Sequence, residues 1–308
     1  MQWISISDSS IYYGICEQKN DSEAVNRIYK RPLVDSVDSF SFQKEIKKKL
    51  IDILSNINKD IIVNKKIAMS LDINKCAIAK NFVDVGLAID DQEKVLNWKM
   101  EKYFSDLEKF FIHHYPVSMP ESENYNYFYS IAISNSFRII LVNTIVEYGF
   151  EPIMLDVGLF SVHKLLQKSF PVQSYEKWGL LEISPQNCSQ KLLVCSDDNI
   201  AYVNYKLIDS DSIIILQNTE PKIINEEYII KFVNFQYNDL NIDKVFGYSH
   251  YPADKSIRDV LENTNITVVN PLPILSRQKV QIDKEYLRDK YLLSQFSEIA
   301  GLISQFHS

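Results

Sequence analysis

Glycine is the residue in shortest supply in this chain, with 7 glycines among 308 residues, whereas about 7% of residues are glycine in an average protein. Loops that cradle phosphate groups depend on glycine, because a residue without a Cβ lets backbone N–H groups approach a ligand closely. The chain therefore has few positions from which loops of this kind can be built.

Basic charge, paired cysteines and long apolar runs are also missing. The net charge is -7 and the isoelectric point is near 5.4, so nucleic acid is not an expected partner. No segment approaches the roughly 18 apolar residues of a membrane span, and no signal peptide is expected at the start. Four scattered cysteines without a Cys-x-x-Cys pair indicate reduced, buried thiols of a cytoplasmic protein. They are Cys16, Cys76, Cys188 and Cys195.

The order of predicted strands and helices indicates two α/β lobes. A chain of 308 residues exceeds what one compact core usually supports. Residues 2–7 and 11–17 form a predicted strand hairpin, and residues 127–170 alternate between strand and helix, which is typical of a layered α/β lobe. A second series of strands begins at Trp178 and continues to residue 207. Each half of the chain thus begins with a strand, a turn and a strand.

Apolar residues at helical spacing predict seven helices. Their ranges are 41–57, 90–112, 136–148, 158–170, 225–237, 255–262 and 284–306. Gly149 is the expected C-cap of the helix before it. His113 and His114 would end the long helix 90–112, where a positive charge is favourable and metal binding is not expected. Asp156 is expected to cap the helix that follows its strand, a structural role rather than a catalytic one.

One segment, residues 149–157, carries the most specific similarity to a known family. Gly149, Pro152 and Asp156 fall there at the spacing of the type IV pilus assembly protein PilM family, which is related to the cell-division protein FtsA and to actin. Elsewhere the chain resembles this family in its order of elements more than in identity. The resemblance implies an α/β fold of the actin-like type, which is a duplicated, ribonuclease H-like plan with two lobes and an inserted small subdomain.

The same resemblance implies the domain limits. The first lobe would comprise residues 1–170, with a core formed by 1–33 and 126–170 and an inserted subdomain at 34–125. The second lobe would comprise residues 171–308, and its C-terminal helix at 284–306 would return to the core.

The positions that match the family's nucleotide-binding loops have lost the expected residues. The family's first phosphate loop reads Ile-Asp-Ile-Gly-Ser-Ser-Ser-Val-Lys and its second reads Val-Asp-Ile-Gly, whereas the chain has serine at both glycine positions and at the first acid. Only the second loop keeps a carboxylate, and a proline after it removes a backbone donor. The degenerate positions, including one glycine of the adenosine loop, are Ser5, Ser7, Asp8, Ser9, Glu182, Ser184 and Gly247. We therefore expect no catalytic residues, no metal and no cofactor, with ATP and Mg²⁺ not expected to bind.

By resemblance, the chain is expected to be a non-catalytic cytoplasmic scaffold of a type IV pilus or related secretion machine, peripheral to the inner membrane. The family binds the cytoplasmic N-terminal peptide of a bitopic inner-membrane protein, PilN, in a groove between the core of the first lobe and the inserted subdomain. The chain would reach the membrane only through such a partner, and apolar anchors with backbone pairing would provide the affinity. Candidate groove residues are Phe82, Val83, Val85, Phe128 and Ile131.

Two other hypotheses are compatible with the same residues. The chain would be a divergent ATPase or kinase if Asp8 and Glu182 converge to hold Mg–ATP between the lobes. It would be a membrane-associated filament protein if its last helix bound lipid, but that helix has few basic residues for contact with anionic headgroups.

Overall fold

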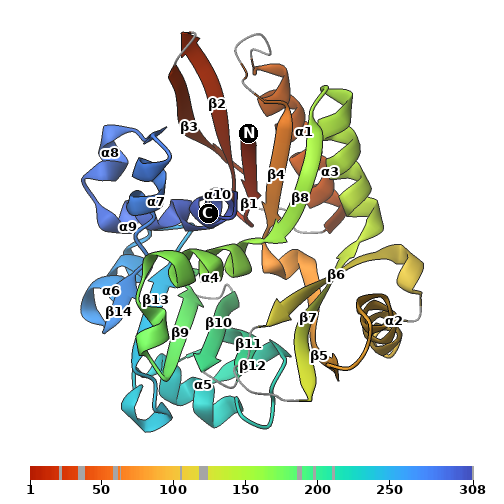
Figure 1. Ribbon diagram of the computed structural model, residues 1–308. Helices are drawn as coiled ribbons and strands as arrows, with labels where there is room; N and C mark the ends of the chain where they lie inside the picture. Colours follow the sequence, from red (N-terminus) through yellow and green to blue (C-terminus); the bar gives the residue numbers. More distant parts are fainter. Residues whose placement is uncertain are drawn as a thin grey trace.

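Three β-sheets organise the chain in the computed structural model, which describes residues 1–20, 23–33, 39–57, 62, 64–104, 106–117, 124–185, 189–196, 199–209 and 212–306. Two sheets have six strands each and one has three (Figure 1). Among these residues, none of the helices has the length and hydropathy that crossing a membrane requires.

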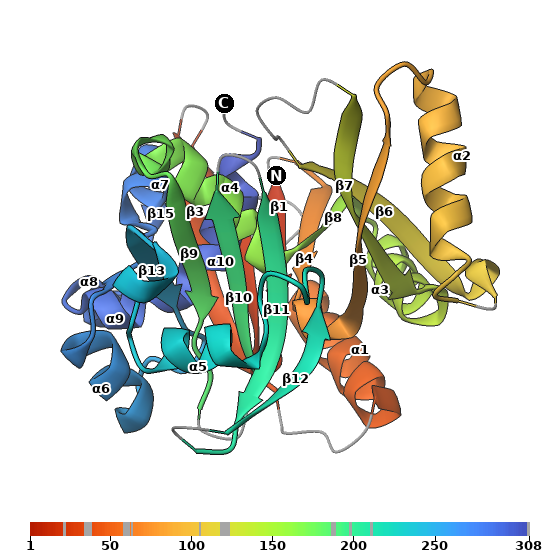
Figure 2. The ribbon, with the colours of Figure 1, turned by 90° about the horizontal axis from the view of Figure 1, so that it is seen from below.

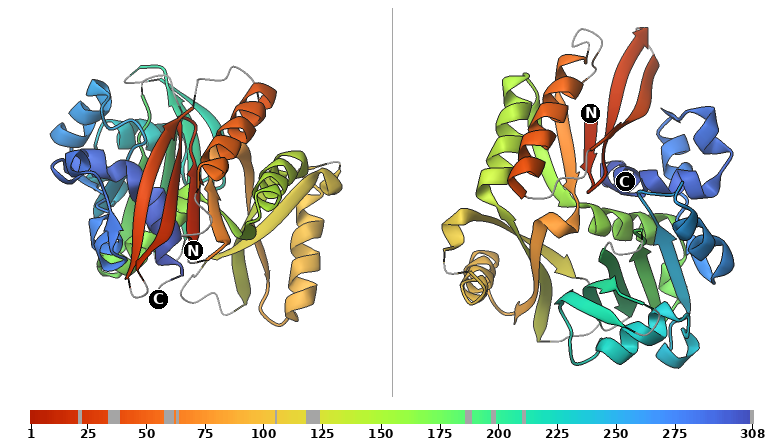
Figure 3. Two further views of the ribbon diagram at one scale, coloured as in Figure 1. Left: turned by 90° about the horizontal axis from the view of Figure 1, so that it is seen from above. Right: turned by 180° about the vertical axis from the view of Figure 1, so that it is seen from behind.

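The first six-stranded sheet has the order β15-β3-β2-β1-β4-β8. Its strands are β1 (Gln2–Ile6), β2 (Ser10–Asn20), β3 (Glu23–Pro32), β4 (Lys66–Leu71), β8 (Glu151–Val157) and β15 (Val280–Gln281). Every residue of β1 is buried, because helices cover both faces of the sheet centre. α1 (Ser39–Ser55) and α3 (Asn135–Glu147) lie together on one side of this sheet (Figures 1 and 3).

The second sheet repeats this plan, with the order β12-β11-β10-β9-β13-β14. Its strands are β9 (Lys177–Glu182), β10 (Ser189–Ser196), β11 (Ile200–Leu207), β12 (Ile213–Asn218), β13 (Lys244–Tyr248) and β14 (Ile266–Val268). In both sheets an antiparallel hairpin pairs with a third strand on one side and with two parallel strands on the other. α5 (Glu226–Val233) and α6 (Lys255–Asn263) accompany this sheet. The duplicated two-lobed plan is thus present.

The small sheet has the order β5-β7-β6, and α2 (Ile89–Met100) lies beside it (Figure 2). Its strands are β5 (Cys76–Asp84), β6 (Phe110–Val117) and β7 (Tyr125–Ser134), with short 3-10 turns at η2 (Ile73–Lys75) and η3 (Leu107–Lys109). These sheets do not follow the predicted insertion limits of 34 and 125. Both α1 and β4 belong to the core of the first lobe, whereas β7 is the central strand of the small sheet and extends past residue 125.

The predicted helix 90–112 is too long. α2 ends at Met100, and Phe110–Val117 form the edge strand β6 instead. Aromatic and β-branched residues favour a strand in this stretch, and Pro116 is tolerated on an edge strand but not inside a helix. His113 and His114 therefore lie on a strand and not at a helix C-terminus.

The predicted C-terminal helix 284–306 is interrupted. It consists of α8 (Lys284–Leu287), α9 (Lys290–Leu293), η6 (Ser294–Phe296) and α10 (Ser297–Ser304). The Asp289 side chain accepts hydrogen bonds from the N–H groups of Tyr291 and Leu292, which starts a new helix where the prediction had none. Before these come α7 (Leu272–Arg277) and the short turns η4 (Val172–Ser174) and η5 (Asn238–Leu240).

Two glycines allow α4 (Gly158–Ser169) and α10 to cross closely between the two large sheets (Figure 1). A Cβ on Gly301 would lie 2.2 Å from the backbone oxygen of Ser161, and one on Gly158 would lie 2.2 Å from the carboxyl group of Glu298. These glycines are therefore used for helix packing. Gly149, with φ of 77°, has the left-handed conformation of the predicted C-cap.

The cysteines that the structure describes are free thiols. Cys16 and Cys195 are buried and Cys76 is partly buried, as expected for reduced cysteines. Cys188 lies outside the described residues.

Candidate functional site

The first hairpin turn, between β1 and β2, uses its own N–H groups internally. The Ser7 hydroxyl accepts hydrogen bonds from the N–H of Ser9 at 3.3 Å and of Ser10 at 3.0 Å. The N–H of Ser7 donates to the carbonyl of Ser10 at 2.9 Å. Because a phosphate-binding turn must offer such donors to its ligand, this turn has little left to offer an anion.

Asp8 points out of this turn toward η2. Its carboxylate lies 3.1 Å from the ammonium of Lys75 and accepts a hydrogen bond from the Asn74 amide at 2.8 Å. Burial acts to raise the pKa of Asp8, but the charges of Lys191 and Lys75 hold that pKa below its ordinary value. Asp8 is thus an ionised partner of lysines from elsewhere in the chain.

Ser5 stands where the family has its first acid, and it is fully buried. Its hydroxyl donates a hydrogen bond to Oε2 of Glu298, on α10, at 3.0 Å. A carboxylate is therefore present beside this position, but α10 supplies it instead of β1.

Lys191, on β10, joins the two lobes. Its ammonium lies 2.9 Å from Oδ2 of Asp72, which follows β4, and 2.5 Å from Oε1 of Glu182, at the end of β9. All three side chains are at most 4% exposed. Burial acts to lower the pKa of Lys191, but the two carboxylates raise it well above the ordinary lysine value. Burial raises the pKa of Asp72 to about 6 despite the opposing charge of Lys191.

Direct contacts also close the space between the two hairpin turns. The Asn74 amide nitrogen that binds Asp8 also donates to the Ser189 hydroxyl at 3.1 Å, and the Asn74 oxygen accepts from Asn204 at 2.9 Å. At the second turn, Ser184 and Gln190 exchange two hydrogen bonds, so the N–H of Ser184 is already used. Protein side chains thus bridge the lobes where this plan of sheets has its cleft.

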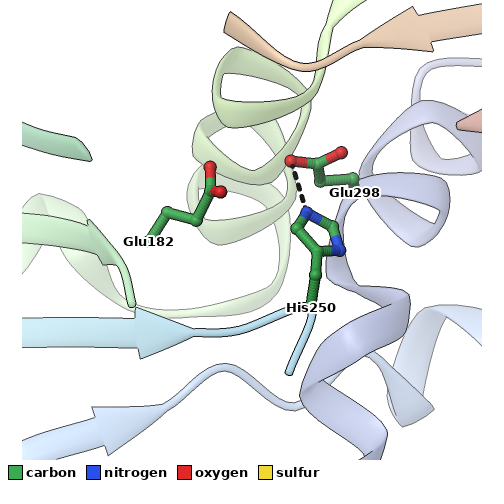
Figure 4. A group of neighbouring side chains, drawn as sticks. All are labelled: Glu182, His250 and Glu298. Carbon is green, nitrogen blue, oxygen red and sulfur yellow. Dashed lines mark ion pairs between the residues drawn. The ribbon is translucent and has the colours of Figure 1, made fainter. Parts of the chain in front are cut away.

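A second polar group adjoins Lys191. The Tyr248 hydroxyl lies 3.2 Å from Oε2 of Glu182 and 3.0 Å from Oε1 of Glu298. His250 Nε2 lies 3.0 Å from the same Glu298 oxygen (Figure 4). Burial acts to lower the pKa of His250, but the Glu298 carboxylate raises it above its ordinary value.

Five of these residues were not found by sequence reasoning: Asp72, Lys191, Tyr248, His250 and Glu298. For two of these residues, the sequence did contain a sign of burial. Lys191 is a lone charge in an apolar strand, and Glu298 is a lone acid beside Ile299 and Ala300 in an apolar helix. Such residues are rarely buried unless they are paired.

Gly247 does not lie in a loop. It lies within β13, between Leu181 on β9 and Val268 on β14, and a Cβ there would lie 2.6 Å from the Ile266 side chain. The prediction of an adenosine-loop role at Gly247 is therefore corrected, because the missing side chain makes room for packing.

The candidate groove residues do not form one surface. Val83 and Ile131 are 2% and 1% exposed and belong to the interior, so their prediction as partner contacts was wrong. Phe128 is partly buried, while Phe82 and Val85 are 48% and 44% exposed. The Phe82 ring packs against Tyr125 and Tyr127 at a hollow of about 430 Å³, which also involves Thr219 and Glu220 of the second lobe.

A different hollow, of about 250 Å³, lies between the small sheet and the first lobe. β6 and α4 form most of its wall, with His113, Pro116, His163, Lys164 and Gln167 among the lining residues. Burial lowers the pKa of His113, and it lowers that of His163 to about 4, so both rings are neutral at pH 7.

Asp156 connects the helices behind this hollow. Its carboxylate accepts from the Val157 N–H at 2.8 Å, from the Ser161 hydroxyl at 3.0 Å, from Lys164 at 3.2 Å and from Gln305 at 2.8 Å. It therefore links α4 to Gln305, at the end of α10. The predicted helix cap is not observed, because Val157 is the N-cap residue of α4 and no side chain forms a capping hydrogen bond there.

Comparison with solved structures identifies the fold of the chain. No family model and no curated protein matches the sequence. Among solved structures, the chain is similar to the PilM-PilN type IV pilus biogenesis complex, with a TM-score of 0.60 and 13% identity over 99% of this chain and 97% of that one. The chain has the actin-like fold.

Two weaker similarities are to proteins described in related terms. One is a Bacteroides thetaiotaomicron protein with an actin-like ATPase fold and unknown function, with a TM-score of 0.45 and 11% identity over 90% of this chain and 93% of that one. The other is the cytoplasmic domain of EpsL, an inner-membrane component of the type II secretion system of Vibrio cholerae, with a TM-score of 0.41 and 9% identity over 81% and 82%. At these identities, the shared property is the fold.

Proposed function

We propose that this protein is a non-catalytic scaffold of a pilus or secretion machine, similar to PilM, and that it binds a cytoplasmic peptide of a PilN-like bitopic membrane protein. On this proposal it is a cytoplasmic protein, peripheral to the inner membrane, and it has no ATPase activity.

The observation that carries the proposal is the Lys191 ammonium between Asp72 and Glu182. In nucleotide-binding members of the fold, a metal ion and phosphate oxygens connect the lobes. Here a lysine of the chain supplies the positive charge and two carboxylates supply the negative charge. ATP would have to break this buried pair, and leaving buried charges without partners costs about 3–5 kcal/mol. The arrangement favours a protein that keeps its lobes together without nucleotide.

The hollow between β6 and α4 is the better candidate for a peptide. It lies where the resemblance implies the groove, between the inserted sheet and the core of the first lobe. Among the described strands, β6 pairs only with β7, so one edge of β6 can accept an extended segment by strand addition. Pro116 lacks an N–H and limits how much of that edge can pair.

The proposal is tested first by calorimetric titration of Mg–ATP into the wild type and Glu182→Ala. We expect no binding at micromolar ATP in either protein. Micromolar affinity in the wild type that Glu182→Ala removes would overturn the scaffold proposal in favour of a divergent ATPase.

A second measurement tests the peptide. The N-terminal cytoplasmic peptide of a PilN-like bitopic membrane protein is labelled, and its binding is followed by fluorescence anisotropy. We expect His113→Glu, in the β6–α4 hollow, to weaken binding at least tenfold. The matched variant Phe82→Glu, in the other hollow, should bind as the wild type does. Equal loss in both variants, or no binding by the wild type, would contradict the proposed site.

A further inference from the structure

Three buried side chains from separate elements meet at one point beside the interlobe pair. Glu182 ends β9, His250 follows β13 and Glu298 lies on α10, and one ligand atom of each lies within 4.8 Å of the others. Figure 4 shows the three side chains directed toward one another. We propose that Glu182, His250 and Glu298 bind one zinc ion, which holds the lobes together. This proposal is independent of peptide binding.

The hydrogen-bond donors at this point are too few for its carboxylate oxygens. Oε2 of Glu182 and Oε1 of Glu298 both face the Tyr248 hydroxyl, at 3.2 and 3.0 Å. A phenol has one proton, so it can donate to only one of the two oxygens at a time. The other oxygen needs a further cation or donor, since a buried acceptor without a partner is costly.

The buried charges are also unbalanced. Three carboxylates, on Asp72, Glu182 and Glu298, surround the single ammonium of Lys191, and each of the four side chains is at most 4% exposed. The N-terminus of α4 lies beside Glu298, and a helix N-terminus contributes about half a positive charge. With a neutral His250, more than one negative charge therefore remains without compensation, and a divalent cation would supply the missing positive charge.

His250 is the observation that separates a metal ion from a simple ion pair. Its side chain is 2% exposed, yet neither ring nitrogen makes a hydrogen bond of good geometry with any described residue. The Nε2 atom is 3.0 Å from Glu298 Oε1 but is not aligned with it. A protonated imidazole has two N–H donors, so both would be poorly satisfied here. A neutral imidazole that binds a metal through Nε2 has only one donor to satisfy.

The ligand types favour zinc over Mg²⁺ and Ca²⁺. Mg²⁺ and Ca²⁺ prefer oxygen ligands alone, whereas an imidazole nitrogen together with carboxylates suits zinc. Zinc accepts three protein ligands in a tetrahedral site, with a water or a hydroxyl such as that of Tyr248 as the fourth. Since a buried site is reached most readily before the lobes close, zinc would enter during folding.

The test is the metal content of the untagged full chain, purified from cells grown with added zinc and dialysed against metal-free buffer. We expect about one zinc per chain by elemental mass spectrometry. His250→Ala and the near-isosteric Glu298→Gln should each lower the content at least fivefold. His114→Ala, which removes a histidine of β6 whose ring hydrogen-bonds to Ser130 and Asn97, should leave it unchanged.

Two outcomes would overturn the proposal. One is a wild-type protein that holds less than a tenth of an equivalent of zinc, even after refolding with zinc. The other is retention of zinc by His250→Ala. Because a variant can lose zinc by failing to fold, the wild type is also refolded with Co²⁺, and we expect the visible absorption of tetrahedral cobalt. Absence of that absorption counts against the site.

Discussion

The two lobes place different residues at matching positions of the same sheet plan. In the first sheet, Ser5 lies between Tyr12 and Ser70 on the neighbouring strands. In the second sheet, Glu182 lies between Lys191 and Tyr248 in the same arrangement. The three residues in register across the first sheet are therefore neutral, whereas the matching three residues of the second sheet include a buried acid and a buried base.

A second pair of matching positions, Asp72 and His250, also differs between the lobes. Asp72 follows Ser70 by two residues, and His250 follows Tyr248 by two. The first lobe therefore contributes an acid where the second lobe contributes a base, and Asp72 pairs with Lys191 across the cleft. The two lobes are therefore complementary at this point, because the charge of Asp72 in the first lobe is balanced by that of Lys191 in the second. A nucleotide between matching loops would need donors from both halves. In the described part of the two turns, the N–H groups of Ser7, Ser9, Ser10 and Ser184 already bond within the protein.

The largest expected effect comes from removing the base of the second lobe. Lys191→Met keeps the length of the side chain but leaves Asp72 and Glu182 without their shared cation. Breaking a buried pair in this way costs about 3–5 kcal/mol. Urea unfolding in buffer with EDTA should show a loss of this size in the free energy of unfolding.

The matched control is Tyr12→Phe, at the corresponding position of the first lobe. It removes a hydroxyl whose hydrogen bond to Gln295 is long at 3.5 Å, so the loss should be below about 1 kcal/mol. Similar losses in the two variants would show that the lobes do not differ in the way proposed.

A smaller but still large effect is expected from restoring the missing acid of the first lobe. Ser5→Asp replaces a donor to Glu298 with a second carboxylate about 3 Å away, and two buried carboxylates at that distance cannot both ionise easily. We expect a loss of about 3 kcal/mol by urea unfolding, since a hydrogen bond to a charged group is lost and a repulsion is added.

The compensating variant is Ser5→Asp with Glu298→Ser, which exchanges the two residues across the contact. It should recover more than half of the loss, because one carboxylate and one hydroxyl are again present. If the double variant is no more stable than Ser5→Asp alone, then α10 does not supply the acid that β1 lacks.

Much of the fold could be predicted because it depends on local signals and on a repeated order of elements. The two hairpins, the alternation from Tyr127 onward and the C-cap at Gly149 are all properties of short segments. The errors arose where tertiary pairing overrides local pattern. The aromatic run after Met100 pairs with β7 as an edge strand, and β4 lies between β1 and β8 although it is far from both along the chain.

The group of buried polar side chains between the lobes was less predictable, because its members come from four distant segments. They are Asp72, Glu182, Lys191, Tyr248, His250 and Glu298. The absence of the family's loop residues at Ser5, Ser7 and Ser184 could be seen by matching loop to loop. The buried side chains that fill the space between the lobes could not be predicted, because their positions depend on the β9–β13 register and on the crossing of α4 with α10. Strand alternation does place Lys191 on the same face as Leu193, which lies in the core. A lysine on the core face of a strand indicates that an acidic side chain must lie beside it, but the sequence does not show which acid that is.

The smallest expected difference is between two hydroxyls at matching positions, Ser70 on β4 and Tyr248 on β13. Ser70 is buried, and its hydroxyl has no hydrogen-bond partner among the described residues, so Ser70→Ala should change the free energy of unfolding by less than about 0.5 kcal/mol. Tyr248→Phe removes the only described donor between Glu182 and Glu298 and should cost about 1–2 kcal/mol. Both are measured by urea unfolding with EDTA, where an unchanged slope shows that the unfolded state is the same. A Tyr248→Phe protein as stable as the wild type would mean that the two carboxylates do not share this phenol, and the asymmetry between the lobes would then rest on Lys191 alone.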